Sequence, residues 1–130
     1  MNRDVVARYA TVVDDPAEAD VAIMRIQAPY YLRDTGIFLE KMFHTGDLDY
    51  TPEVLAPIID LCTKVPTIVD IYLDRPAVIP EINAAAAALI GSFGSSDAAL
   101  CDIVFGRVAP RSEEHTSELQ SRQYLVCRLL

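Results

Sequence analysis

The chain has 130 residues, of which 52% are hydrophobic and 23% are charged, and its formal net charge is −8. This composition excludes an intrinsically disordered chain and supplies enough apolar side chains for one domain or for part of a larger one. The acidic charge argues against a nucleic acid or an anionic membrane surface as the partner. No apolar run reaches the length that is needed to span a membrane.

The first third of the sequence predicts one firm strand, followed by a long loop. Residues 2–9 are typical of the tail of a helix, and residues 10–13 are typical of a short strand. Residues 21–26 (VAIMRI) form an apolar run that predicts a strand. Residues 27–50 are an irregular stretch rich in turn residues, with a short helix predicted at 37–44. A loop of this length in a compact domain is usually functional or disordered.

The middle of the sequence is organised around one buried strand. Residues 51–53 (Thr-Pro-Glu) predict the start of a helix that runs to about Lys64, because they offer a capping hydroxyl, a proline at the first helical position and an acid near the positive helix end. Residues 67–73 (TIVDIYL) then form a run typical of a strand covered on both faces. The polar turn at residues 74–76 (Asp-Arg-Pro) ends this central strand.

The last part continues the alternation of strands and helices. We expect a helix at residues 78–85, a strand at 86–93 and a helix at 97–105 that Gly106 stops. The order β-α-β-α-β-α predicts a mostly parallel sheet with right-handed crossovers. The predicted fold class is therefore α/β, a sheet flanked by helices in a three-layer sandwich.

Residues 111–130 do not continue this pattern. Their sequence, RSEEHTSELQSRQYLVCRLL, resembles a sequencing-library adapter translated in frame. We therefore expect one partial domain at residues 1–110, followed by a non-native tail that is disordered or arbitrarily helical.

The motifs that would indicate a metal, a phosphate or a disulfide are missing. Residues 91–96 (GSFGSS) lack the Gly-Lys-Ser/Thr ending of a phosphate-binding loop, so a turn with a serine cap explains them. Cys62, Cys101 and Cys127 are odd in number and have no Cys-x-x-Cys spacing. His44 has no second histidine at ligand spacing. The sequence therefore predicts no metal and no cofactor.

Acidic residues gather in the long loop, where they suggest acid/base catalysis by carboxyl groups. Glycoside hydrolysis needs two carboxyl groups that flank the scissile bond. A solvated, charged loop is the alternative explanation. Asp74 and Arg75, at the end of the central strand, form either a pair that hydrogen-bonds sugar hydroxyls or an ordinary surface ion pair. The loop carboxylates are Asp34, Glu40, Asp47 and Asp49.

Several short segments, in this order and spacing, carry a resemblance to a known family. The sequence resembles the C-terminal α/β sandwich domain of glycoside hydrolase family 3, which contains β-glucosidases and β-xylosidases. The resemblance covers most of residues 9–110. The segments that carry it are ADVAI at 19–23, GDLDY at 46–50, PTIV at 66–69, DRPA at 74–77, FGSSDAAL at 93–100 and DIVFGRVAP at 102–110.

The resemblance implies a retaining hydrolase of terminal β-linked sugars whose nucleophilic aspartate lies on an N-terminal barrel. Many members take their acid/base glutamate from the loop after the strand that matches residues 21–26. Here that position holds Pro29, whereas Arg33 matches the arginine of the motif. The acid/base residue is therefore not carried over. The remaining acid/base candidates are Glu40, Asp47 and Asp49, and the expected substrate-binding residues are Arg33, His44, Asp74 and Arg75.

Two hypotheses follow. The first is a fragment of a family 3 β-glycosidase, which has a truncated sheet, takes a carbohydrate substrate and is inactive without a barrel domain in cis. The second is a free-standing, doubly wound binding or regulatory module without catalysis, because a fold alone does not fix a function.

Overall fold

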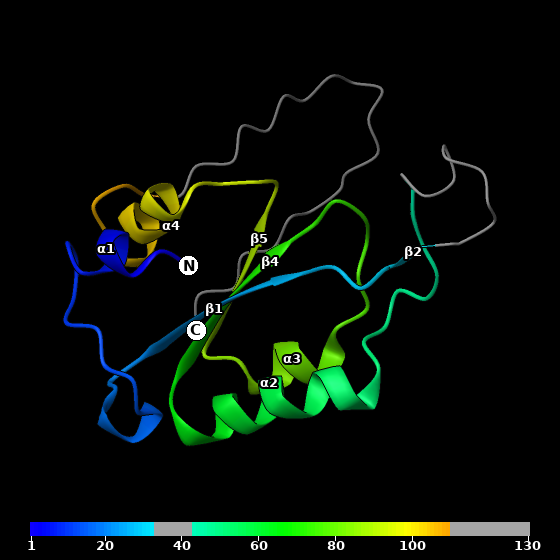
Figure 1. Ribbon diagram of the computed structural model, residues 1–130, viewed down its shortest axis with the longest axis horizontal. Coiled ribbons are helices and arrows are strands. Elements are labelled where there is room, and N and C mark those ends of the chain that lie inside the picture. Colours follow the sequence, from blue (N-terminus) through cyan, green and yellow to red (C-terminus); the bar gives the residue numbers. More distant parts are fainter. Residues whose placement is uncertain (33–42, 110–130) are drawn as a thin grey trace. The chain divides into compact units, whose positions relative to one another are not determined.

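The computed structural model describes residues 1–32 and 43–109 (Figure 1). The chain divides into two compact units. One unit comprises Val13–Gly94, and the other joins Met1–Val12 to the residues from Ser95 onward.

A three-stranded parallel sheet forms the centre of the unit at Val13–Gly94. The strand order is β1-β4-β5, so β4 (Thr67–Tyr72) lies between β1 (Ala22–Gln27) and β5 (Ala88–Ser92). Both pairs of neighbouring strands are parallel. The predicted central strand is therefore central, and the predicted α/β class with a parallel sheet and flanking helices is confirmed.

Two helices lie side by side against one face of this sheet, α2 (Pro52–Lys64) and α3 (Pro80–Ala85), as Figure 1 shows. The core between them and the sheet centres on Ile58, Val69 and Ile82, of which Val69 and Ile82 are fully buried. Full burial of an aliphatic side chain of this size is worth about 1.5–3 kcal/mol. The side chains that complete this core are Met24, Ile26, Tyr50, Leu55, Ile59, Cys62, Ile79, Ala86 and Leu89.

The start of α2 differs in detail from the expectation. Thr51 is the N-cap residue, but its hydroxyl does not cap the helix. The backbone N–H of Glu53 and the Thr51 hydroxyl favour the ionised carboxylate of Glu53 and so lower its pKa. The predicted capping hydroxyl at Thr51 is therefore wrong, because no backbone N–H of α2 donates to it.

The long loop contains a second, smaller sheet. β2 (Tyr31–Leu32) pairs antiparallel with β3 (His44–Thr45), and the Thr45 hydroxyl donates to the backbone carbonyl of Tyr31 at 3.0 Å. The prediction of an irregular stretch is therefore wrong at these residues. The predicted helix at 37–44 is wrong at His44, which pairs with Leu32 in extended backbone, and residues 37–42 lie outside the described residues.

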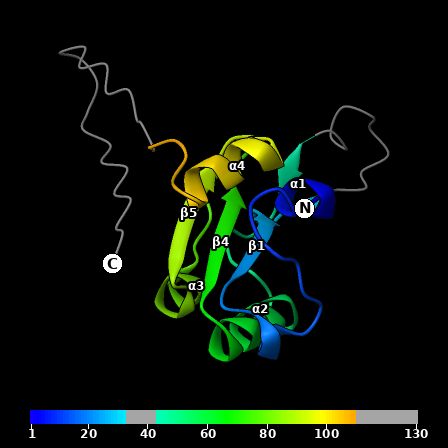
Figure 2. The ribbon, with the colours of Figure 1, turned by 90° about the vertical axis from the view of Figure 1, so that its left-hand side faces the viewer.

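The other unit is built on α1 (Arg3–Val6) and α4 (Asp97–Val104). A short 3₁₀ helix, η1 (Pro16–Glu18), belongs to the unit that contains the parallel sheet. The Ser96 side chain accepts a hydrogen bond from the Ala99 backbone N–H, so it caps α4 as the serine-rich turn predicted. Figure 2 shows the helices and the sheet from a second direction.

Tyr9 holds α1 and α4 together within their unit. Its hydroxyl donates to the carboxylate of Asp102 at 2.8 Å, its ring stacks on Phe105 with the ring centroids 5.5 Å apart, and the Arg107 guanidinium lies 4.0 Å from the ring centroid. The hydrogen bond to Asp102 raises the pKa of Tyr9. The helix predicted at residues 2–9 is shorter than expected, and the strand predicted at 10–13 is wrong, because these residues pair with no strand among the described residues.

Candidate functional site

Two of the predicted sugar-binding residues follow the end of β4 in the parallel sheet, and His44 lies on β3, in the segment that follows β1. Gln27 and Tyr72, the last residues of β1 and β4, are register partners, and the Ala28 backbone N–H donates to the Tyr72 carbonyl at 2.9 Å. Asp74 and Arg75 come directly after β4. The carboxyl ends of parallel strands are where open α/β sheets bind their ligands.

His44 and Asp74 meet at this edge of the sheet. The Nδ1 atom of His44 hydrogen-bonds the Oδ2 atom of Asp74, although the two residues are far apart in the sequence. Tyr30, from the segment after β1, stacks on the imidazole with the ring centroids 3.8 Å apart and the planes 17° from parallel. The His44 side chain remains 31% exposed, so it is open to a ligand from solvent.

Arg75 joins the same cluster through the turn after β3. Its Nη2 atom donates to the backbone carbonyl of Gly46 at 2.8 Å. Its Nη1 atom is buried and has no hydrogen-bond partner among the described residues. Gly46 has φ +93°, and a Cβ atom there would lie 2.1 Å from the Tyr31 ring, so only glycine fits. The turn at Gly46 therefore packs closely against the Tyr31 ring and is held by the Arg75 guanidinium. We call Tyr30, His44, Asp74 and Arg75 the strand-end cluster.

Tyr50 fastens the end of the long loop to β1. Its hydroxyl donates to the backbone carbonyl of Gln27, the last residue of that strand. Burial raises the pKa of Tyr50 to about 12, because the phenolate would lose more hydration than the neutral hydroxyl. Two backbone contacts hold the next residues of the loop. The Val78 N–H donates to the Leu48 carbonyl at 2.9 Å, and Asp49 and Val78 form an isolated parallel β-bridge.

The structure brings only some of the predicted residues together. His44, Asp74 and Arg75 belong to the cluster, whereas Arg33 and Glu40 lie outside the described residues. The other two acid/base candidates, Asp47 and Asp49, are exposed. Neither side chain forms a hydrogen bond or an ion pair with a described residue. The structure therefore assigns the acid/base role to neither of these two candidates.

Two members of the site escaped the sequence analysis. Tyr30 supplies the stacked ring, and Gly46 supplies a carbonyl. A backbone carbonyl leaves no signal in the sequence. The aromatic residue stands after Ala28-Pro29 in a segment whose turn residues gave no periodicity.

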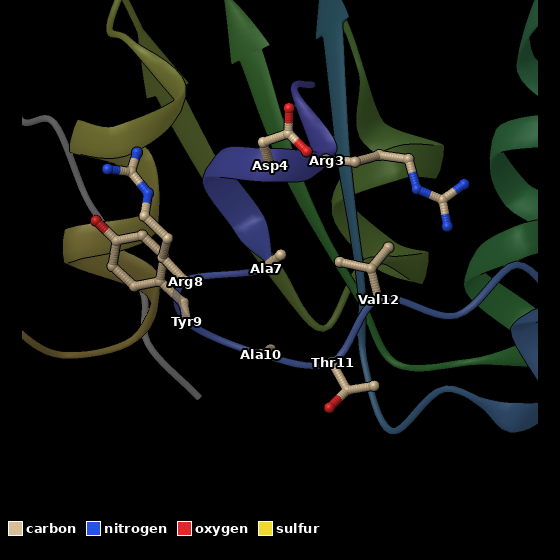
Figure 3. A pocket seen from close by; sticks show the side chains of 8 residues that line it. All are labelled: Arg3, Asp4, Ala7, Arg8, Tyr9, Ala10, Thr11 and Val12. Carbon is tan, nitrogen blue, oxygen red and sulfur yellow. The ribbon is translucent and has the colours of Figure 1, made fainter.

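An open hollow of about 640 Å³ lies in the other unit (Figure 3), and the residues that line it are Arg3, Asp4, Ala7, Arg8, Tyr9, Ala10, Thr11 and Val12. None of the predicted site residues lines it. Figure 3 shows the guanidinium groups of Arg3 and Arg8 pointing to opposite sides, so they do not converge on one anion. The hollow therefore has no built ligand site.

The described part of the chain has no metal cluster and no membrane-spanning helix. Across residues 1–32 and 43–109, no group of three or more His, Cys, Asp or Glu side chains is placed to hold a metal ion. Cys62 is a free thiol that packs against the core, and Cys101 is fully buried. No helix in these ranges is long and apolar enough to cross a membrane.

The chain is similar in sequence to known proteins that are named β-glucosidases. The chain is 47% identical over 103 residues to a probable β-glucosidase C of Aspergillus flavus, covering 79% of this chain and 16% of that protein. It is 45% identical over 107 residues to the β-glucosidase C of Emericella nidulans, covering 82% and 17%. The chain is homologous to one segment of the β-glucosidases. A periplasmic β-glucosidase/β-xylosidase of Dickeya chrysanthemi is 35% identical over 92 residues, which are 68% of this chain and 14% of that protein.

This relation confirms the predicted resemblance to β-glucosidase-type glycoside hydrolases. The β-glucosidase-like segment spans only about a sixth of the length of these relatives. No family model matches the chain, and no solved structure matches it.

Proposed function

We propose that the chain is part of a β-glucosidase-type glycoside hydrolase and that its strand-end cluster binds the sugar. The supporting observation is that the cluster lies at the carboxyl edge of a parallel sheet in a chain whose relatives are named β-glucosidases. In this proposal the parent protein is as long as its β-glucosidase relatives. The part outside this chain, about five-sixths of that length, carries the nucleophilic aspartate on a barrel domain.

The chemistry of the cluster suits a carbohydrate. Each sugar hydroxyl can both donate and accept a hydrogen bond, so a sugar is held by donors and acceptors placed together. Arg75 offers guanidinium N–H donors. Its buried Nη1 atom has no partner in the part of the chain that the structure describes, and a buried donor without a partner is costly. Asp74 and His44 offer acceptors.

Exposed aromatic rings stand at the same edge of the sheet. An aromatic face is a flat apolar surface, and the C–H face of a pyranose ring can cover it. Soluble proteins seldom gather exposed rings without a use for them. The exposed rings that adjoin the carboxyl ends of β1, β4 and β5 or the ends of the β2–β3 pair are Tyr30, Tyr31, Phe43, Tyr72 and Phe93.

The cluster lacks the second carboxylate that hydrolysis requires. Retaining glycosidases use two carboxyl groups about 5–5.5 Å apart, one as the nucleophile and one as the acid/base. Asp74 is the one carboxylate of the cluster, and it is hydrogen-bonded to His44. In this proposal the chain binds and orients the sugar, and hydrolysis needs the barrel domain.

A sugar titration of the 130-residue chain tests this proposal. Methyl β-D-glucopyranoside is added to ¹⁵N-labelled chain, and amide and arginine side-chain shifts are followed by NMR. We expect millimolar binding, with saturable shifts confined to residues around the strand-end cluster. Sorbitol is the control, because it has hydroxyls but no ring face.

Variants sharpen the same titration. Arg75→Lys keeps the positive charge but loses the planar fork, and we expect it to weaken binding about fivefold or more. Lys64→Gln is the matched control, because Lys64 forms only an exposed ion pair with Asp60 on α2. Uniform or absent shifts with the glucoside would overturn the proposal, as would equal binding by both variants.

A further inference from the structure

The hydrogen bond between His44 and Asp74 fixes more than the position of the imidazole. An ionised carboxylate only accepts hydrogen bonds. The His44 nitrogen that meets Asp74 is Nδ1, so Nδ1 must carry a proton for the bond to form. In the neutral imidazole the other nitrogen, Nε2, then has a free lone pair.

Nε2 lies on the side of the ring away from Asp74. Within residues 1–32 and 43–109, no group forms a hydrogen bond with this nitrogen. Tyr30 covers one face of the imidazole, and the side chain is still 31% exposed. The stacked ring limits rotation of the imidazole, and the carboxylate selects its tautomer.

We infer that His44 accepts a hydrogen bond from a sugar hydroxyl through Nε2, and that Asp74 is the positioning residue that keeps the proton on Nδ1. The hydroxyl part of this inference rests on the proposed function, whereas the tautomer part does not. Arg75 then supplies the donor, and His44 supplies the acceptor, for neighbouring hydroxyls of one sugar ring. No bond to carbon is made or broken at His44.

The tautomer is measured on the 130-residue chain without any sugar. Long-range ¹H–¹⁵N NMR of the histidine side chains distinguishes a protonated ring nitrogen from one with a free lone pair. His115→Gln removes the second histidine signal. In the neutral imidazole we expect the proton on Nδ1. We expect Asp74→Ala to move a large part of the population to the Nε2–H tautomer, whereas the Nε2–H form in the unchanged chain would overturn the inference.

The acceptor role is measured with a variant that separates it from folding. His44→Asn retains an amide N–H near the position of Nδ1, which can still donate to Asp74, but it has nothing at the position of Nε2. We expect it to keep the urea midpoint of the chain and to bind methyl β-D-glucopyranoside about five- to tenfold more weakly. Unchanged affinity in a folded His44→Asn chain would overturn the acceptor role.

The two failures are distinguishable. If the unchanged chain shows no sugar-dependent shifts, the proposed function fails together with the acceptor role, and the tautomer measurement still decides the role of Asp74. If the unchanged chain binds the sugar and His44→Asn binds it equally well, only this inference fails.

Discussion

The Nε atom of Arg25 donates to the Oδ2 atom of Asp70 at 2.7 Å, and the two residues are register partners on β1 and β4. Asp70 is 1% exposed, and its second oxygen has no hydrogen-bond partner within residues 1–32 and 43–109. A carboxylate in the middle of the central strand is therefore held by one strong contact with a neighbouring strand. Removal of a partner from such a buried pair typically costs about 3–5 kcal/mol, because a buried charge is left uncompensated.

We expect Arg25→Met to lower the free energy of unfolding of the 130-residue chain by about 3 kcal/mol, measured by urea denaturation. The double variant Arg25→Met/Asp70→Leu removes the stranded charge as well, and we expect it to recover most of this loss. An Arg25→Met chain as stable as the unchanged chain would show that the pair does not hold these strands together.

Tyr50 makes the free energy of unfolding fall as the pH rises into the alkaline range. The pKa of Tyr50 is raised to about 12 in the folded chain, against about 10 for an unperturbed tyrosine. The neutral hydroxyl therefore contributes its full stabilisation below pH 10, and the contribution is lost as the pH rises from 10 to 12. At pH 8 we expect Tyr50→Phe to be less stable than the unchanged chain by about 1 kcal/mol, because the bond to Gln27 is lost.

The difference in the free energy of unfolding between the two chains is the informative quantity, since they differ only at this side chain. We expect this difference to shrink steadily between pH 10 and 12 in paired urea titrations. A difference that stays constant across this range would contradict the raised pKa of Tyr50.

Gly46 offers a test of how tightly the turn fits. Gly46 and Gly94 have nearly the same backbone conformation, with φ +93° and +94°. A Cβ atom at Gly46 would lie 2.1 Å from the Tyr31 ring, whereas at Gly94 the nearest atom, on Tyr72, is 3.8 Å away. Gly94→Ala therefore measures backbone strain alone, which is about 1–2 kcal/mol.

We expect Gly46→Ala to lower the urea midpoint more than Gly94→Ala and to disturb the NMR signals of Tyr31 and of the Arg75 guanidinium. The double variant Gly46→Ala/Tyr31→Ala removes the clash, so its loss should approach that of Gly94→Ala. Equal losses in the two single glycine variants would show that the Tyr31 ring moves aside without cost.

Where the sequence carried strong patterns, the fold could be predicted from it. The β-branched run of the central strand and the proline-led start of α2 both indicated their elements correctly. The pairing of β2 with β3 could not be predicted, because each strand is two residues long and neither has a periodicity of its own. The predicted strand at residues 10–13 shows the converse, since a short apolar run without a partner strand stays irregular.

For the candidate site, the sequence indicated which polar residues stand near strand ends, but it did not predict the contacts between them. Asp74 and Arg75 were expected at a strand end, and His44 was expected among the substrate-binding residues. The His44–Asp74 bond joins segments 30 residues apart, so no local pattern encodes it. The stacking of Tyr30 is likewise a tertiary contact.

An assay of the purified chain tests the division of labour in the proposed function. We expect the 130-residue chain to show no hydrolysis of an aryl β-glucoside above the rate of the buffer, because the cluster has one carboxylate rather than two. Turnover that a His44→Asn or Asp74→Ala variant abolishes would contradict this expectation and would make the chain a catalyst in its own right.

Sequencing of the source locus with long reads tests most directly the claim that this chain is a segment of a β-glucosidase. We predict that the reading frame upstream of Met1 continues into a barrel-encoding region with a nucleophilic aspartate, and that the genuine frame after residue 110 differs from residues 111–130. In-frame stop codons just before Met1, with no β-glucosidase-like sequence upstream, would contradict the account. That result would instead support a free-standing binding or regulatory module without catalysis.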